Sequence, residues 1–137
     1  MAPPRIRAED GRAAVAAIRA IASPVGPAAS VASDVEALNR KPSPDLATAV
    51  RYLLQVLADA HPGHTVEVRV PPYGAVQCVE GPRHTRGTPA NVVEMDATVW
   101  VALATGDLSW ADAREGAHVH ASGSRADLST LVPLQEW

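Results

Sequence analysis

The chain has 137 residues, which is enough for one domain with a single hydrophobic core and too short for two independent domains of ordinary size. Its 12 basic and 15 acidic side chains give a net charge of -3, which excludes a general electrostatic attraction to nucleic acid or to an anionic membrane. Cys78 is the single cysteine, so no intramolecular disulfide can form, and a reducing compartment is expected.

The N-terminal apolar run does not have the pattern of a secretion signal. Arg19 interrupts the run, and Glu9 and Asp10 lie where such a signal carries positive charge. No stretch approaches the roughly 18 apolar residues that a membrane-spanning helix needs. We therefore predict a cytoplasmic protein without integral membrane association.

The first predicted element is a short amphipathic helix over residues 9 to 22. Val15, Ile18 and Ala22 recur at helical spacing, whereas Arg12 and Arg19 lie on another face. The stretch that follows, up to residue 42, is rich in serine, proline and alanine, which predicts a surface linker. We expect residues 1 to 42 to form this helix and linker and residues 43 to 137 to form the main domain, within a single compact unit.

The strongest helix signal begins at Ser43. Serine is a good N-cap, Pro44 suits the first helical position, and Asp45 complements the positive end of the helix dipole. One face is apolar at intervals of three and four residues, and it consists of Leu46, Val50, Leu53, Leu54 and Leu57. This stripe predicts a helix that packs on a sheet and ends at the sequence His-Pro-Gly, residues 61 to 63.

Three strands are predicted after this helix. Valines at positions 66, 68 and 70 alternate with Thr65, Glu67 and Arg69, as expected for a strand with one buried face. The sequence PPYG at residues 71 to 74 reverses the chain, so residues 75 to 80 should form an antiparallel partner. Residues 91 to 95, NVVEM, predict a third strand.

An uncharged helix is predicted over residues 97 to 105. Asp96 is a suitable cap for it, and Gly106 can end it in a left-handed conformation. A helix that is apolar nearly all round is normally buried on most sides. We therefore expect it in the core, or beside an apolar cavity or interface.

The remaining elements are short. Ser109 and Asp112 predict the start of a helix that ends at Gly116, and residues 117 to 121 predict a fourth strand. Ser124 and Asp127 repeat the capping pattern, which predicts a last helix with Leu128 and Leu131 that ends at Pro133. The order of elements predicts an α+β fold, with a largely antiparallel sheet covered on one face by helices.

This order of elements resembles the sterol-carrier-protein-like domain, and most of all the bacterial sterol carrier orthologue family. The matching motifs are an apolar helix ending in Leu103-Ala104-Thr105-Gly106, a short helix, a strand ending in glycine, and a closing helix. The similarity covers Pro44 to Leu134. It implies a sandwich in which helices cover one face of a curved sheet and enclose an apolar tunnel for lipids or other hydrophobic molecules.

The uncharged helix and the resemblance together favour a cavity wall over simple packing at six positions. These are Leu53, Leu57, Met95, Val99, Trp100 and Leu103. The predicted function is non-catalytic binding of a hydrophobic small molecule or lipid in a cavity between sheet and helices. No cofactor is expected.

A basic loop follows the second strand. Arg83, His84 and Arg86 lie between Gly81 and Gly87, where they could bind a carboxylate or a phosphate, although an exposed connection is the simpler interpretation. If the loop binds anions, the chain could be a thiol- or acyl-handling enzyme or an accessory subunit, because related domains form the C-terminal part of thiol-dependent isomerases. A third hypothesis is a protein-interaction module, with a partner on the apolar helix or on an open sheet edge.

Other candidate sites are weaker. His118 and His120 could supply two metal ligands, but no third ligand lies at recognisable spacing, so no metal site is predicted. Cys78 lies inside a predicted strand without an activating base nearby, which favours a small buried side chain over a nucleophile. The chain has no basic groove, so no nucleic-acid partner is expected.

Overall fold

The structure is a computed structural model that describes residues 4–22, 43–81 and 91–137. Within these ranges lie four helices and four strands. In chain order they are α1 (Ala8–Ala22), α3 (Pro44–Ala60), β1 (Val66–Val70), β2 (Gly74–Cys78), β3 (Val92–Met95), α4 (Ala97–Thr105), α5 (Trp110–Glu115) and β4 (Val119–Ser122). Every helix and strand that was predicted between residues 43 and 121 is present, and the predicted linker lies outside the described residues.

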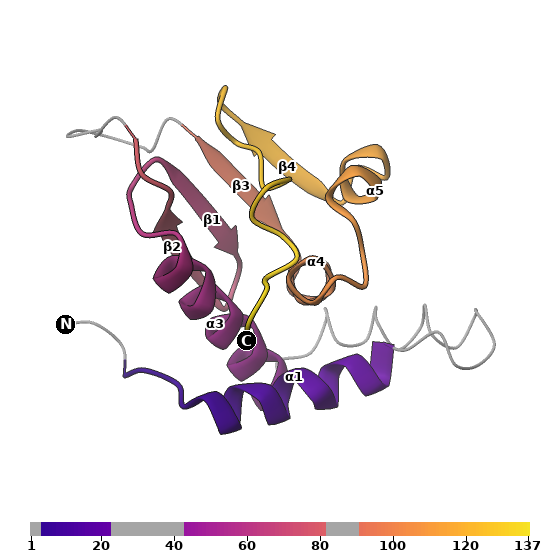
Figure 1. The fold of residues 1–137 in the computed structure, drawn as a ribbon. Helices are drawn as coiled ribbons and strands as arrows, with labels where there is room; N and C mark the ends of the chain where they lie inside the picture. Colours follow the sequence, from indigo (N-terminus) through magenta and orange to yellow (C-terminus); the bar gives the residue numbers. More distant parts are fainter. Residues whose placement is uncertain (1–3, 23–42, 82–90) are drawn as a thin grey trace.

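The four strands form one mixed sheet in the order β2-β1-β3-β4. β1 pairs antiparallel with β2 and parallel with β3, and β3 pairs antiparallel with β4. The helices lie over one face of this sheet (Figure 1). The predicted α+β fold, with a mostly antiparallel sheet and helices on one face, is therefore confirmed.

One face of the sheet is apolar and buried against the helices. The valines of β1 are fully buried, as are Val93 and Met95 of β3, whereas Glu67, Arg69 and Glu94 stay partly exposed on the other face. Thr65 departs from the predicted alternation, because it is only 1% exposed although it was expected on the polar face. Its backbone N–H bonds to the carbonyls of Cys78 and Val79, which places it at the corner where β2 ends.

α3 is the central helix. The Ser43 hydroxyl accepts a hydrogen bond from the Leu46 backbone N–H at 3.3 Å, which confirms the predicted N-cap. The whole predicted leucine and valine stripe of α3 is buried. None of the helices in the described part of the chain is long and apolar enough to cross a membrane.

α4 is buried on most sides, as its uncharged sequence predicts. Trp100 is completely buried, and its indole N–H donates to the Val50 carbonyl at 3.3 Å, which ties α4 to α3. Gly106 ends the helix with a φ of 90°, the left-handed conformation that favours glycine. Asp96 lies at the N-cap position, but its side chain makes no capping hydrogen bond, so that detail of the prediction was wrong.

β4 begins two residues later than predicted. Ala117 has a φ of 57°, and the His118 backbone N–H donates to the Ala113 carbonyl at 2.9 Å. These residues therefore close the end of α5 before the strand starts. The start of α5 is as predicted, because the Ser109 hydroxyl accepts a hydrogen bond from the Asp112 N–H at 3.1 Å.

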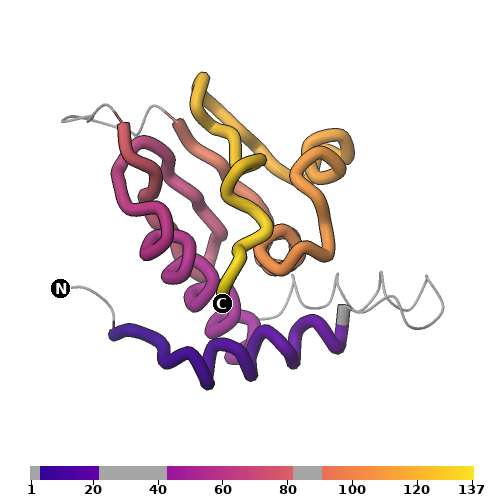
Figure 2. Tube along the Cα trace, in the orientation of Figure 1, coloured from indigo at the N-terminus to yellow at the C-terminus, as the bar shows by residue number. Residues whose placement is uncertain are grey.

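The predicted last helix was wrong, because residues 123–137, here the C-terminal segment, form turns and extended chain. Asp127 accepts a hydrogen bond from the Ser129 N–H at 2.8 Å, a local turn that competes with helix capping. Only one helix-like turn follows, at Leu128, before Pro133. The segment crosses the helical face between α3 and α4 (Figure 2), and the Leu134 N–H donates to the Ala104 carbonyl of α4 at 2.9 Å.

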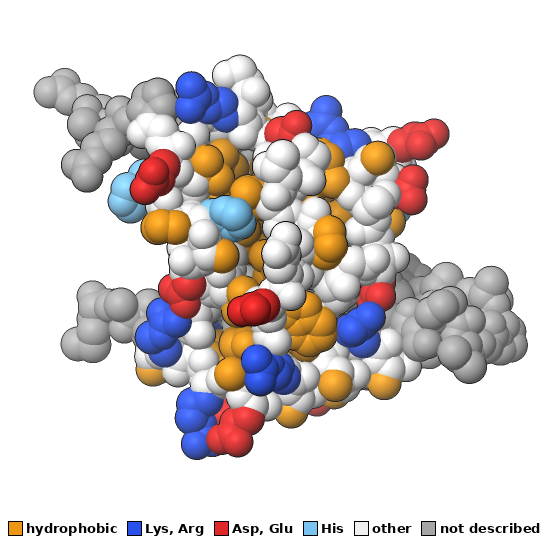
Figure 3. Space-filling model, in the orientation of Figure 1, with side chains coloured by type: hydrophobic (Ala, Val, Ile, Leu, Met, Phe, Trp, Pro, Cys, Tyr) orange, Lys and Arg blue, Asp and Glu red, His pale blue; other side chains and the backbone are white. Residues whose placement is uncertain are grey.

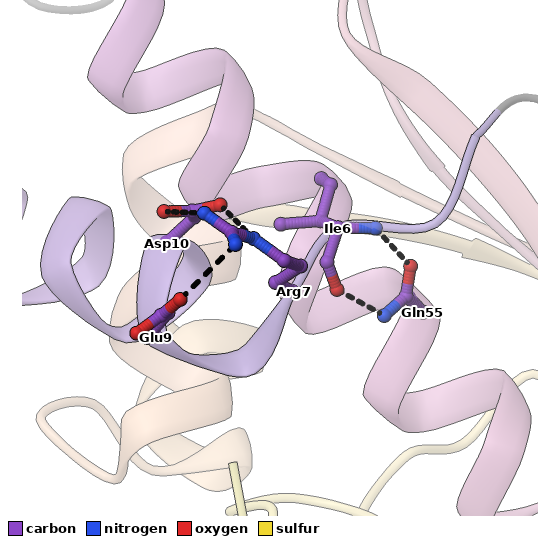
Figure 4. Close-up of polar contacts among 5 residues, drawn as sticks. All are labelled: Ile6, Arg7, Glu9, Asp10 and Gln55. Atoms are coloured by element: carbon purple, nitrogen blue, oxygen red, sulfur yellow. Dashed lines mark hydrogen bonds and ion pairs between the residues drawn. The ribbon is translucent and has the colours of Figure 1, made fainter.

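α1 packs on α3. Val15 and Ile18 of α1 are buried, which confirms the predicted apolar face at these two positions. Just before the helix, the backbone N–H and carbonyl of Ile6 both bond to the Gln55 amide at 3.0 Å, while Arg7 pairs with acidic residues of its own first turn (Figure 4). The N-terminal residues are thus joined to the outer side of α3.

Candidate functional site

The six predicted cavity residues come together in the hydrophobic core between sheet and helices. Five of them are buried there, and Val99 is half-buried and packs against the same core: Leu53 and Leu57 from α3, Met95 from β3, and Val99, Trp100 and Leu103 from α4. The structure therefore places all six in or against one hydrophobic cluster. Their role as ligand contacts stays a prediction.

A groove with both apolar and polar lining runs between the second half of α3 and the C-terminal segment, and we call it the α3 groove. It has a volume of ≈ 620 Å³, within the range usual for small-molecule sites. Its apolar lining consists of Val56, Ala60, Leu131, Pro133 and Leu134, and its polar lining includes Asp59, His61 and Glu136. Hydrophobic side chains gather in the hollowed centre of this face, with charged side chains around it (Figure 3).

The α3 groove lies close to the predicted cavity residues. Val56 and Ala60 are each three residues further along α3 than Leu53 and Leu57, and so are their neighbours on the helix surface. On the other side, Leu134 is bonded to Ala104, which follows Leu103. The groove therefore adjoins the layer between sheet and helices, although none of the six predicted cavity residues lines it. Sequence reasoning missed it because one wall is the segment that was predicted to be a helix.

The end of the C-terminal segment is held by α1. The Arg12 guanidinium donates to the backbone carbonyl oxygen of Trp137 at 2.7 Å. The guanidinium carbon of Arg19 lies 5.8 Å from the centre of the Trp137 ring, a cation–π distance. These contacts join α1 to the segment that forms one wall of the α3 groove.

A second hollow, of ≈ 330 Å³, lies beside β4 and the start of α4. Met95 and Val99 contribute to it, but most of the lining is polar and includes Glu94, Asp96, His118 and His120. The two histidines are thus close to carboxylates, although His118 lies outside the strand. Among the described residues, no group of three or more His, Cys, Asp or Glu side chains could hold a metal ion.

Cys78 lies at the end of β2 and is fully buried. Burial raises the pKa of its thiol to about 11, because the thiolate would lose its hydration. The thiol is therefore protonated at neutral pH, whereas a nucleophilic cysteine needs the thiolate. The interpretation of Cys78 as a small buried side chain fits this environment.

The predicted anion-binding residues Arg83, His84 and Arg86 lie outside the described residues. Their role stays a prediction, and with it the hypothesis of a thiol- or acyl-handling enzyme or accessory subunit. The protein-interaction hypothesis also stays a prediction. Gly81, at the start of that loop, is described and lies beside Thr65.

A mixed sheet with helices over one face makes this an α+β domain. The family model described as bacterial SCP ortholog matches residues 42–134. The chain belongs to this family, as its sequence motifs predicted. The match extends from the residue before the Ser43 cap to Leu134 and leaves α1 outside. No curated protein sequence matches the chain.

Proposed function

We propose that this protein binds a hydrophobic small molecule or lipid in the layer between sheet and helices, without making or breaking bonds in it. The observation that carries the proposal is the partly apolar α3 groove, which lies near Leu53 and Leu57 in a chain of the SCP family. Membership of the family supports a hydrophobic ligand, and the groove supplies a place where it can enter.

Entry would require a shift of the C-terminal segment. Leu128, Val132 and Leu134 of this segment cover the core, yet the segment has no regular secondary structure and is bonded to α4 through the Leu134 N–H. A ligand that displaces these side chains would reach Leu57 and Trp100. The segment would then close over the ligand as it now closes over the core.

The driving force would be removal of apolar ligand surface from water. This contributes about 25 cal/mol per Å² of buried apolar surface. The polar groups at the groove, Asp59, His61 and Glu136, would remain at the water-facing side and orient any polar end of the ligand.

Native mass spectrometry of gently purified protein tests the proposal, followed by titration with a panel of lipids and acyl-CoA molecules. The wild type should carry a bound molecule or accept one from the panel. Leu131→Asp, which puts a charge on the groove wall, should weaken binding at least about tenfold because the carboxylate would be desolvated. Ile21→Asp is the matched control, because Ile21 is exposed on α1 and lies outside the groove lining.

Two outcomes would contradict the proposal. One is a ligand-free spectrum with no response to any molecule of the panel. The other is equal binding by the wild type and Leu131→Asp, which would place the ligand away from the α3 groove.

A further inference from the structure

Thr65 has a buried hydroxyl without a hydrogen-bond partner. Its backbone is satisfied, since its N–H donates to Cys78 and Val79 and its carbonyl accepts from the Asn91 amide at 3.0 Å. Among the described residues, the Thr65 Oγ1 is the one buried side-chain oxygen or nitrogen that lacks a partner. Burying such an atom without a partner is unfavourable, and native proteins normally supply a partner for it. The hydroxyl therefore points to a missing partner.

Arg125 is fixed beside this hydroxyl through Asn91. The Arg125 backbone N–H donates to the Asn91 Oδ1 at 2.9 Å, while the Nδ2 of the same side chain holds Thr65. Asn91 is only 5% exposed, so these two hydrogen bonds are sheltered from water. None of the ion pairs in the described ranges involves the exposed Arg125 guanidinium.

The Thr65 hydroxyl and the Arg125 guanidinium both lie close to Gly81. A Cβ atom at Gly81 would lie 2.5 Å from the Thr65 Oγ1 and 2.9 Å from the Arg125 Nη1. The hydroxyl and the guanidinium therefore approach the same side of the Gly81 Cα. A side chain at position 81 would collide with both groups, so their close approach to the chain depends on glycine.

The chemistry of the two groups selects the ligand. The guanidinium can only donate hydrogen bonds, and the hydroxyl is free to donate. A single oxygen that accepts from both would satisfy them, and a negative charge on it would balance the arginine. Carboxylate and phosphate oxygens have these properties, whereas a cation or an amine has not.

We propose that Thr65, Gly81 and Arg125 form a binding site for an oxyanion. A carboxylate or phosphate oxygen accepts from the Thr65 hydroxyl, and the Arg125 guanidinium closes over the anion from the solvent side. The oxyanion is either free in solution or the head group of an amphiphile. The site stands on its own geometry and does not depend on a hydrophobic ligand in the α3 groove.

Amide NMR titration at constant ionic strength tests the site, with sodium phosphate and sodium acetate as probes and sodium chloride as reference. Phosphate or acetate should shift the amide signals of Thr65, Gly81, Asn91 and Arg125 in a saturable way, and chloride should not. Arg125→Gln and Thr65→Val should each weaken binding about tenfold or more, since a hydrogen bond to a charged group is lost. Arg51→Gln is the matched control, because Arg51 bonds to Tyr73 near the other end of β2.

A second measurement separates loss of the site from loss of the fold. Without added anion, Thr65→Val should unfold at the same Tm as the wild type or a higher one, because the hydroxyl has no partner to lose. The rise of Tm that phosphate produces in the wild type should disappear in this variant. A lower Tm of Thr65→Val without anion would show that the hydroxyl already has a partner and would overturn the proposal.

The titration itself overturns the site if chloride produces the same shifts as phosphate and acetate, or if the two site variants titrate like the wild type. Octanoate distinguishes the two sources of the oxyanion. Binding of octanoate at least about tenfold tighter than acetate, with added shifts at Val56 and Leu131, would identify an amphiphile head group. Equal affinities would identify a free oxyanion.

Discussion

Two helices pack on α3 by different means. α4 packs with a fully buried tryptophan, Trp100, and carries no charge along its length. α1 packs with a narrow strip of Ala14, Val15 and Ile18, and Gly11 lies directly against Tyr52. Exposed polar contacts surround this strip, such as the Arg5–Asp59 ion pair. α4 is thus held by one large apolar side chain, and α1 by smaller apolar side chains at close approach, surrounded by surface contacts that are each worth little.

The two helices that pack on α3 also differ in whether the family model covers them. The family match begins at residue 42, so α4 and α3 belong to the matched part and α1 does not. α1 nevertheless reaches the C-terminal segment through Arg12, Arg19 and Trp137. Because the segment is a wall of the α3 groove, the interface between α1 and α3 is the one connected to the candidate ligand site. Separation of α1 should therefore loosen the groove before it unfolds the domain.

The largest expected effect on stability comes from the interface between α4 and α3. Trp100→Ala should lower the free energy of unfolding by about 3–5 kcal/mol, because it removes a buried indole and leaves a cavity. Trp110→Ala is the control, because Trp110 is half-buried and contacts Arg114 at the surface, so a clearly smaller loss is expected. Urea denaturation monitored by circular dichroism measures both. Equal losses of unfolding free energy in the two variants would show that the buried Trp100 does not stabilise the core more than the half-buried Trp110 does.

A smaller effect on stability is expected at the interface between α1 and α3. Gly11→Ala would place a Cβ 2.1 Å from the Tyr52 ring, so the two helices must move apart at a cost of about 1–3 kcal/mol. Alanine also favours a helix by about 1 kcal/mol over glycine, so an isolated α1 peptide should become more helical. Hydrogen exchange in the whole protein should accordingly become faster in α1, while α4 keeps its protection.

The control for this prediction is Ala13→Gly at an exposed position of α1. It should lower helicity in the peptide and leave the contact with Tyr52 intact. If Gly11→Ala slows exchange in α1, helix propensity outweighs the close approach, and the interface is looser than its geometry indicates.

Local signals in the sequence were sufficient wherever a residue acts on its own neighbours. Ser43 and Ser109 cap helices as predicted, Gly106 adopts the left-handed conformation, and the valines of β1 alternate into the core. In each case the cause is a hydrogen bond or a dihedral angle within a few residues, or the period of the strand. Such features can be derived without knowledge of the rest of the fold.

The sequence-based predictions were wrong where contacts with residues distant in the sequence determine the local structure. Ser124 and Asp127 have the spacing of a capping box, but Arg125 is bound by Asn91 and Leu134 by Ala104. These partners lie over 25 residues away in the sequence, so no pattern of period or capping could reveal them. The burial of Thr65 also depends on a distant residue, because its carbonyl bonds to the Asn91 side chain. Both candidate binding places in the described structure, the α3 groove and the oxyanion site, include residues from this unpredicted C-terminal segment.

The smallest expected effect concerns the ion pair between α1 and the end of α4. Hydrogen bonds from Arg19 hold the pKa of Asp107 below its usual value. A carboxylate with a lowered pKa in the folded state stabilises that state at neutral pH, and the contribution is lost as the pH falls through the folded pKa. The side chains are 40% and 48% exposed, so the pair should contribute less than about 1 kcal/mol.

Asp107→Asn tests this contribution directly, through urea denaturation of wild type and variant from pH 7 down to pH 2. The variant should be slightly less stable at pH 7, and the difference should vanish once Asp107 is protonated in the folded wild type, below the usual aspartate pKa of about 4. Glu115→Gln is the control, since Glu115 is exposed on α5 and forms none of the ion pairs in the described ranges. A difference that persists unchanged to pH 2 would mean that Asp107 acts through its hydrogen bond with Thr105 or through packing, and that its charge does not hold α1 in place.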